Sequence, residues 1–389
     1  MNFFARFIFI AFFTVSLSFV SCRKAEAART ELVFGTVCTV NAFDDGTTEL
    51  YNSLFERLHS MDEKFSTSKS NSEIEKINAA AGKSAVEISD EVLFVLKIAL
   101  SFAEITNGAF DPTVGPLVKL WGINTEYARV PEQWEIDNAL KLVDWSRVKI
   151  EENKVFLPVE GMRLDLGGIV KGYAADVLAF MVKEAGVKRA VIDLGGNIYV
   201  AGKKKDRSLW RVGVKNPQNP EHSTAITLSL PENSVVTSGV YERFFIKDNI
   251  RYHHIINPKT GYPVDNGLTS VTIVSKSSTA CDALSTSLFI LGMEKGFALL
   301  KQLERQNFPT AGITVKEKTA DSTDGMGMWL FGSGAVNVDG FENPVKLTAA
   351  GLPFVEKADG MADCFNALYI DSENYMYSTE DLEKCYGMS

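Results

Sequence analysis

The chain has 389 residues, of which 46% are hydrophobic and 23% charged, and its formal net charge at pH 7 is -9. This composition is typical of a globular protein and excludes a fibrous or disordered chain. The negative charge, with no basic stretch interleaved with aromatic residues, argues against a nucleic-acid partner.

The N-terminal residues predict export. Arg6 precedes a 14-residue apolar run at 7–20, which suits a signal-peptide core and is shorter than a membrane span of about 20 residues. The run ends in FVSC, which resembles a bacterial lipobox. We therefore predict a signal peptide at 1–21, lipidation of Cys22, a tether at 22–30 and a folded domain at 31–389. The alternative is plain secretion with an incidental cysteine.

The other four cysteines, Cys38, Cys281, Cys364 and Cys385, show no CxxC or Cys/His spacing, which argues against zinc. An oxidising compartment would allow Cys364 and Cys385 to pair. Buried free thiols are the alternative for all four.

Periodicity and turn residues predict the following elements in the first half of the chain. We expect a strand at 31–43 interrupted by Gly35, helices at 48–66 and 90–106, a loop at 107–116, short strands within 143–168, and a helix at 167–186 that starts at two glycines.

The second half is predicted to be rich in strands. We expect two strands joined by a Gly-Gly turn at 189–202, strands through 210–275 with a hairpin around Asp248-Asn249, helices at 277–292 and 293–305, a loop insertion at 316–361, and a last hairpin at 365–378.

The stretch CDALSTS offers oxygen ligands for a cation. Asp282 and Thr286 lie four residues apart on a predicted helix and so share one face, with Ser285 beside them. A carboxylate with hydroxyls suits Mg²⁺, which completes its coordination with water and phosphate. The alternative is that Asp282 only complements the helix dipole.

Two further stretches suit an anionic, aromatic ligand. In DLGGIVKGYAAD, Gly167 allows close backbone approach to an anion at a helix start, and Lys171 adds a charged donor. In GAFDPT, Phe110 offers a ring face and Asp111 an acceptor for ring N–H groups. The structural alternatives are a solvated lysine after a Gly-Gly turn, and a core aromatic beside a turn-forming aspartate.

Two of the four histidines are adjacent in HHIINP. Strand alternation sends His253 and His254 to opposite faces, so that only one of them can point into a given cleft. A neutral imidazole there could deprotonate a hydroxyl nucleophile, whereas a hydrogen-bonded structural histidine is the alternative.

Taken together, seven motifs in register resemble the FAD:protein FMN transferase family, the ApbE-type flavin-trafficking lipoproteins. They are FGT, SNSEIEKIN, GAFDPTVGPLV, DLGGIVKGYAAD, IDLGGNIYV, HHIINPKTGYPV and DALSTSLFILG, between Phe34 and Gly292. The resemblance implies a single α/β domain with a T-fold-like core of mixed or antiparallel sheets and flanking helices. It also implies cleavage of FAD with Mg²⁺ outside the cytoplasmic membrane, transfer of FMN to a Thr or Ser of acceptor flavoproteins, and release of AMP.

The resemblance assigns roles residue by residue. His254 would be the base that deprotonates the acceptor hydroxyl. Mg²⁺ would be held by Asp282, Thr286, the Val170 carbonyl and nearby Ser285. The FAD site would include Phe34, Ser68, Ala109, Phe110, Asp111, Gly167, Lys171, Tyr173 and Ile256. Membrane redox complexes are the expected acceptors, and the periplasmic side of the inner membrane is the expected location.

The chain departs from the family pattern at two positions. Asn257 replaces the usual Asp before Pro258, a near-isosteric change. Ser68 stands where many members carry a Tyr over the flavin. Because a small hydroxyl cannot stack, water could replace the acceptor, which makes an Mg²⁺-dependent FAD pyrophosphatase the alternative, alongside transfer or instead of it. A non-catalytic FAD-binding lipoprotein is the rival from another class.

Overall fold

The computed structural model of the chain describes residues 25–221, 223–305, 366–373, 375–378 and 387–388. The predicted signal peptide, Cys22, the insertion at 316–361 and the possible Cys364–Cys385 pair lie outside these residues. Within the described part, Cys38 and Cys281 are buried free thiols.

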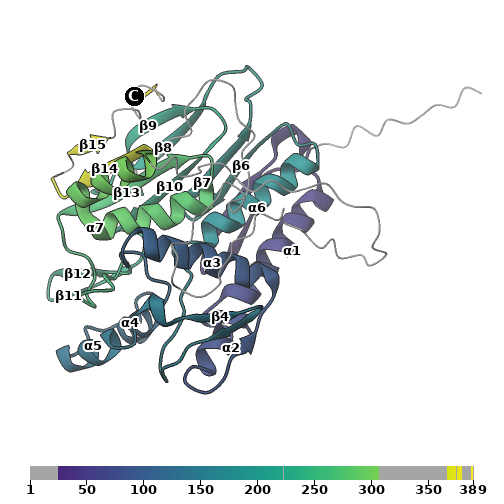
Figure 1. Ribbon diagram of the computed structural model, residues 1–389. Helices are drawn as coiled ribbons and strands as arrows, with labels where there is room; N and C mark the ends of the chain where they lie inside the picture. Colours follow the sequence, from purple (N-terminus) through teal and green to yellow (C-terminus); the bar gives the residue numbers. More distant parts are fainter. Residues whose placement is uncertain (1–24, 222, 306–365, 374, 379–386, 389) are drawn as a thin grey trace, which may run out of the picture.

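The described residues form a layered α/β domain built on an antiparallel sheet (Figure 1). The strands follow the order β1-β2-β6-β7-β10-β13-β14-β15. Their bounds are β1 Arg29–Val33, β2 Thr36–Asn41, β6 Arg189–Leu194, β7 Asn197–Gly202, β10 Asn233–Gly239, β13 Leu268–Ser275, β14 Asn366–Asp371 and β15 Met376–Ser378. The predicted strand pair at 189–202, with its Gly-Gly turn, and the last hairpin are confirmed.

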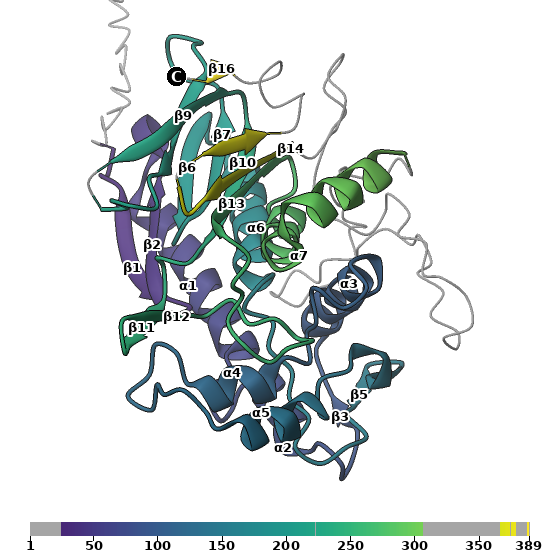
Figure 2. The same cartoon turned by 90° about the vertical axis from the view of Figure 1, so that its left-hand side faces the viewer.

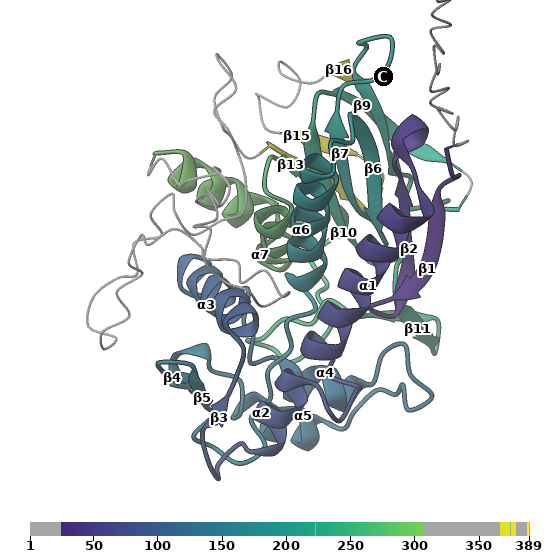
Figure 3. The same ribbon diagram turned by 90° about the vertical axis from the view of Figure 1, so that its right-hand side faces the viewer.

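Both faces of this sheet are covered. Helices α1 (Thr48–Phe65), α6 (Val170–Glu184) and α7 (Ser278–Arg305) lie over one face (Figure 3). The small sheet of β8 (Trp210–Lys215), β9 (Thr224–Leu230) and β16 (Gly387–Met388) covers the other. Neighbours on β10 show the alternation, since Val235 packs with β8 and β9 while Val236 joins the core under the helices.

The predicted strand at 31–43 is instead a hairpin. Val33 pairs with Thr36, so that Phe34 and Gly35 form a two-residue loop, and both have positive φ. This geometry matches the twist of the paired strands and usually calls for Asn-Gly. An aromatic residue at the first position concealed the turn, and β1 also begins two residues inside the predicted tether.

The predicted helices around the cavity form, together with smaller elements, of which only some were predicted. Helix α3 (Asp90–Ile105) is capped by Ser89, as expected. The short helices α2 (Glu73–Ala79), α4 (Gly115–Trp121) and α5 (Gln133–Leu140) were missed because each spans only about two turns. Strands β4 (Lys149–Glu151) and β5 (Lys154–Phe156) are the short strands expected within 143–168, and with β3 (Val86–Glu87), which was not predicted, they form a small separate sheet. Strands β11 (Phe244–Lys247) and β12 (Ile250–His253) form the expected hairpin.

Helix α7 contains the two predicted helices, separated at Gly292, whose φ of 77° and ψ of 171° are not helical. The helix is long and apolar enough to span a membrane, but it packs against β13 and α6 as part of the core. Its N-terminus is capped from outside by Asp176 of α6. The Asp176 carboxylate accepts hydrogen bonds from Ser277, Ser278 and Thr279, so α6 and α7 are joined by a buried polar cluster.

Candidate active site

A cavity of about 990 Å³ lies at the end of the sheet where the β1–β2, β6–β7 and β10 turns meet α4, α6 and α7. In Figure 2 this is the end that faces α4 and the β11–β12 hairpin. The cavity is large enough for a dinucleotide. Twelve of the predicted site residues line it, namely Phe34, Ser68, Ala109, Phe110, Asp111, Gly167, Val170, Lys171, His254, Ile256, Asp282 and Thr286.

Asp282 is the only acidic residue that α7 places on the cavity in the described part of the chain. One of its oxygens accepts a hydrogen bond from the Gly172 N–H at 2.9 Å, and the Lys171 ammonium lies 3.3 and 3.4 Å from the two oxygens. The Thr286 hydroxyl follows one turn later and lies 3.4 Å from Ser238 Oγ. The Asp282 carboxylate is thus buried, faces the cavity and is paired with the Lys171 ammonium.

Ser285, which was expected near the metal ligands, does not line the cavity in this structure. Its side chain is fully buried, its hydroxyl lies 2.8 Å from Ser238 Oγ, and it donates to the Asp282 carbonyl at 3.0 Å. Its hydroxyl is therefore already engaged by neighbouring groups. Ser285 therefore supports the neighbouring Ser238 and Thr286.

The two glycines before and within α6 permit close packing against α7. A Cβ on Gly172 would lie 2.3 Å from the Ser278 carbonyl oxygen, and one on Gly168 would lie 3.1 Å from the Phe110 ring. Gly172 therefore tolerates no side chain without moving backbone. This approach brings the Val170 backbone and Lys171 to the same wall as Asp282.

Asp111 lines the cavity, but its carboxylate is already occupied. Oδ1 accepts hydrogen bonds from the Thr113 N–H at 2.7 Å and the Thr113 hydroxyl at 2.6 Å, and Oδ2 accepts from the Trp145 N–H at 3.3 Å. Burial nevertheless raises its pKa. Phe110 packs edge-on against Phe102 and shows 5% exposure, so it contributes a firmly held wall.

Tyr173, which was expected in the FAD site, is buried in the core and does not line the cavity. It lies on α6, packs against Phe65 and Phe94, and donates its hydroxyl hydrogen bond to Glu91 at 3.0 Å. Residues 170 and 171 face the cavity, and Tyr173 is turned toward α1 and α3. Burial, followed by the Glu91 charge, raises the pKa of its hydroxyl far above the usual value.

The two histidines separate as predicted. His253 is buried, lies 2.8 Å from the Val264 carbonyl oxygen and packs edge-on against Phe289, as a structural residue does. His254 lines the cavity, and its Nδ1 lies 3.2 Å from the Arg243 carbonyl oxygen. That contact places the proton on Nδ1 and leaves Nε2 as an acceptor. Burial, then the Arg243 charge, lowers the pKa of His254 to about 3, so the ring is neutral at pH 7.

Among the cavity residues that sequence reasoning did not single out, two make informative contacts. Arg243 reaches the β1–β2 turn and donates to the Phe34 carbonyl at 3.2 Å, which fixes an aromatic residue in a backbone conformation that favours glycine. Asn197 is fully buried. Its Oδ1 accepts from Ser278, but its Nδ2 has no hydrogen-bond partner among the described residues. Asn197 lies in the quoted motif IDLGGNIYV, and this motif could have indicated that the residue belongs to the site. No sequence pattern indicated the same for Arg243.

These features define an α/β enzyme whose cavity is lined by a buried carboxylate beside a hydroxyl, an asparagine with an unpaired buried donor and a neutral imidazole. The ApbE family matches residues 34–308. The FAD:protein FMN transferase of Treponema pallidum is 38% identical over 299 residues, which cover 72% of this chain and 83% of that protein. An FAD:protein FMN transferase of Klebsiella pneumoniae is 38% identical over 257 residues, which cover 66% of this chain and 79% of that protein.

Solved structures agree. The ApbE protein of Thermotoga maritima superimposes with a TM-score of 0.71 at 27% identity, over 92% of this chain and 98% of that one. The Pseudomonas stutzeri flavinyl transferase ApbE, in its apo form, gives 0.63 at 31% identity, over 72% and 88%. The chain belongs to the ApbE family, and it is a transferase.

Proposed function

We propose that this protein is an Mg²⁺-dependent FAD:protein FMN transferase, which splits FAD and attaches FMN through a phosphoester to a Thr or Ser of an acceptor protein. The observation that carries the proposal is the meeting of Asp282, Thr286 and neutral His254 on one dinucleotide-sized cavity. The names of the relatives support the same reaction. AMP is the leaving product.

The residues present fit Mg²⁺. The Asp282 carboxylate, the Thr286 hydroxyl and the Val170 carbonyl are hard oxygen ligands, and Mg²⁺ keeps the rest of its shell for water and phosphate. The Lys171 ammonium lies 3.3 Å from Asp282 Oδ1, so this carboxylate is charged and faces a cationic group already. When bound, the metal would neutralise pyrophosphate charge and stabilise the charge that develops on the leaving AMP.

The chain's own residues would then handle the proton and the anion. The acceptor hydroxyl oxygen forms a bond to the flavin-side phosphorus, the bond from that phosphorus to the bridging oxygen breaks, and AMP leaves with the bridging oxygen. His254 Nε2 takes the hydroxyl proton. Asn197 lines the cavity, and its buried Nδ2, which has no partner in the described residues, would gain one if a small side-chain movement brought it to a ligand oxygen.

A pyrophosphatase activity is the second candidate, because of Ser68. This residue is exposed at the cavity, and its hydroxyl lies 3.0 Å from the Ser66 hydroxyl. No ring covers the cavity from this position. Water could therefore take the place of the acceptor hydroxyl and release free FMN with AMP.

The cellular setting is part of the proposal. The lipobox-like FVSC motif at the end of an apolar run supports an exported protein anchored through Cys22, on the periplasmic side of the inner membrane. Its acceptors would be exported or membrane flavoproteins. A non-catalytic flavin carrier would keep the cavity but would need neither paired oxygen ligands nor a base.

The deciding experiment incubates the purified protein with FAD and Mg²⁺, with and without a Thr-containing acceptor protein. AMP, free FMN and protein-bound flavin are measured together. Bound flavin with little free FMN would establish the transferase, and AMP with free FMN regardless of acceptor would establish the pyrophosphatase. Tight FAD binding without any Mg²⁺-dependent AMP release would contradict both and favour the carrier.

A further inference from the structure

A surface rich in basic residues lies at the opposite end of the sheet from the cavity. Residues 203–207, KKKDR, form the turn after β7 and carry four cations and one anion, although the whole chain has a net charge of -9. Lys203, Lys204 and Arg207 have no ion-pair partner in the described part of the chain. The next-but-one residue, Leu209, is 48% exposed.

Aromatic side chains back this turn. A shallow hollow of about 460 Å³ is lined by Phe43, Arg189, Lys204, Lys205, Asp206 and Trp210. The Phe43 and Trp210 rings lie 5.8 Å apart, and the Arg189 guanidinium lies over the Phe43 ring. Asp44 offsets part of the charge by pairing with Arg189 and, at 3.7 Å, with Lys205. Lysines, an exposed leucine and aromatic rings are the composition of surfaces that contact lipid headgroups.

The N-terminal segment leaves the domain beside this surface. The Glu26 N–H donates to the Gly46 carbonyl at 2.9 Å, and Gly46 directly follows Phe43, Asp44 and Asp45. Asp45 also accepts from the Lys188 N–H at the start of β6. The predicted anchor, Cys22, precedes Glu26 by four residues, which span at most about 14 Å when extended. A lipid on Cys22 would hold this end of the domain against the bilayer.

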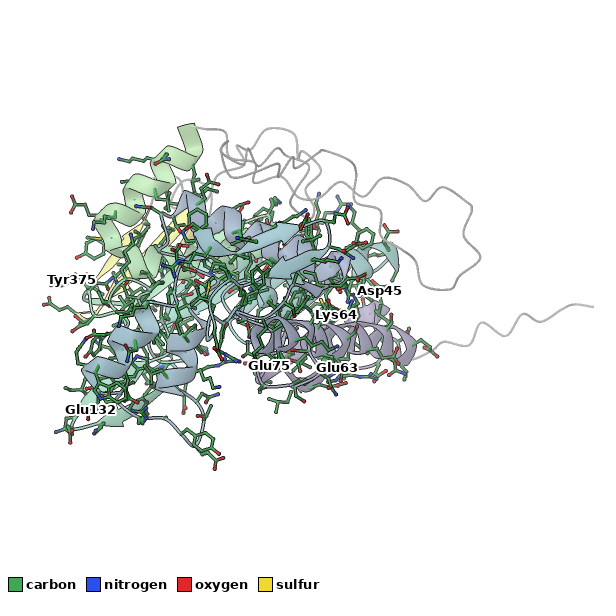
Figure 4. The ribbon with its side chains drawn as sticks, turned by 60° about the horizontal axis from the view of Figure 1, so that its bottom comes forward. Asp45, Glu63, Lys64, Glu75, Glu132 and Tyr375 are labelled. Carbon is green, nitrogen blue, oxygen red and sulfur yellow. The ribbon has the colours of Figure 1, made fainter. Side chains whose placement is uncertain are left out.

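We propose that this basic surface, formed by residues 203–207 with Phe43, Lys188, Arg189 and Leu209, docks on an anionic lipid bilayer and holds the cavity facing away from it. The Gly195-Gly196 turn, which lines the cavity, is at the other end of β6, six residues or about 20 Å away. Figure 4 shows Asp45 and Glu132 at opposite ends of the molecule, with the cavity residue Glu75 between them. The proposal rests on membrane anchoring and is independent of the reaction at the cavity.

The test uses the full-length protein in lipid nanodiscs of phosphatidylglycerol or phosphatidylcholine, and in detergent. Lysine acylation is followed residue by residue by mass spectrometry. We expect acylation of Lys188, Lys203 and Lys204 to slow on the order of tenfold in phosphatidylglycerol discs relative to detergent, and to recover at high salt. Lys149 and Lys154, which are exposed on the small β4–β5 sheet, serve as internal controls and stay unchanged.

A charge-neutral variant sharpens the test. Lys203→Gln, Lys204→Gln and Arg207→Gln together should abolish the protection of Lys188, whereas Lys149→Gln with Lys154→Gln should leave it intact. Equal acylation in discs and detergent would overturn the proposal. Equal protection in both lipids would also overturn it, because the anchor alone would then hold the surface near the bilayer. AMP release in detergent should be the same for all forms, which separates this question from the reaction.

Discussion

Two buried carboxylates meet the first turns of α7, and they differ in how many donors surround them. Asp176 accepts hydrogen bonds from two backbone N–H groups and two hydroxyls. Asp282, a turn further along, has one N–H donor and the Lys171 ammonium, and it faces the cavity. A saturated carboxylate can only hold structure together, whereas one with free lone pairs on a cavity can bind a ligand.

The largest expected effect comes from removing the unsaturated carboxylate. Asp282→Ala should reduce Mg²⁺-dependent AMP release by at least about a hundredfold, since electrostatic stabilisation of the leaving group is lost. The thermal midpoint should fall only modestly, because in the described residues the Asp282 carboxylate accepts one backbone hydrogen bond and pairs with a Lys171 side chain that remains partly exposed. Steady-state AMP release against Mg²⁺ concentration measures the effect. An undiminished rate would remove Asp282 from the metal site.

The Nδ1 of His254 is hydrogen-bonded to the Arg243 carbonyl oxygen, which leaves Nε2 as the proton acceptor. His254→Ala should lower transfer to an acceptor protein by on the order of a hundredfold and hydrolysis by water by less, because a protein hydroxyl relies on a positioned base. The ratio of bound flavin to free FMN after a fixed time measures this difference. His253→Asn, at the structural histidine, is the matched control and should leave that ratio unchanged. Equal loss of both reactions would contradict the role of acceptor base.

Removing the Asp176 carboxylate, which accepts four hydrogen bonds, should lower the stability of the fold and leave the reaction rate unchanged. Asp176→Ala leaves four buried donors unsatisfied and should lower the free energy of unfolding by about 3 kcal/mol. Activity per folded molecule should persist, and denaturant unfolding beside a rate measurement separates the two quantities. A loss of rate with normal stability would mean that Asp176 takes part in the reaction.

The contribution of Asp176 to the free energy of unfolding should depend on pH. Burial raises the pKa of Asp176 to about 7 against the opposing hydrogen bonds from Thr279, Ser278 and Ser277. The folded state therefore holds the proton more tightly than the unfolded chain, and the contribution of this group is complete below about pH 4 and declines toward pH 7. Relative to Asp176→Asn, which cannot ionise, the wild-type protein should lose stability over that interval.

Local signals in the sequence predicted most of this arrangement. Strand alternation placed His253 and His254 on opposite faces, helical spacing placed Asp282 and Thr286 on one cavity wall, and Ser89 marked a helix start. Contacts between distant segments could not be predicted in this way. Tyr173 and Ser285 lie in motifs that suggest a place at the site. The direction in which each side chain points is set by packing of Tyr173 against α1 and α3 and of Ser285 against β10.

The same reason explains the residues that were overlooked. Arg243 reaches Phe34 across 209 positions, and Asp176 caps a helix that begins 102 residues later. No periodicity connects such positions. The Phe34-Gly35 turn was missed for a local reason, because phenylalanine rarely takes positive φ and its turn is held by Arg243 from elsewhere in the fold.

The smallest expected effect tests the unpaired donor. Asn197→Asp keeps the acceptor for Ser278 and replaces Nδ2 by an oxygen, so FAD affinity should fall about tenfold if Nδ2 donates to a ligand oxygen. Flavin fluorescence without Mg²⁺ measures binding without turnover. The matched control is Ser275→Ala, since the Ser275 hydroxyl is buried and unpaired among the described residues but does not line the cavity. If both variants bind FAD like the wild-type protein, the unpaired Nδ2 of the cavity-lining Asn197 takes no more part in FAD binding than the unpaired Ser275 hydroxyl does.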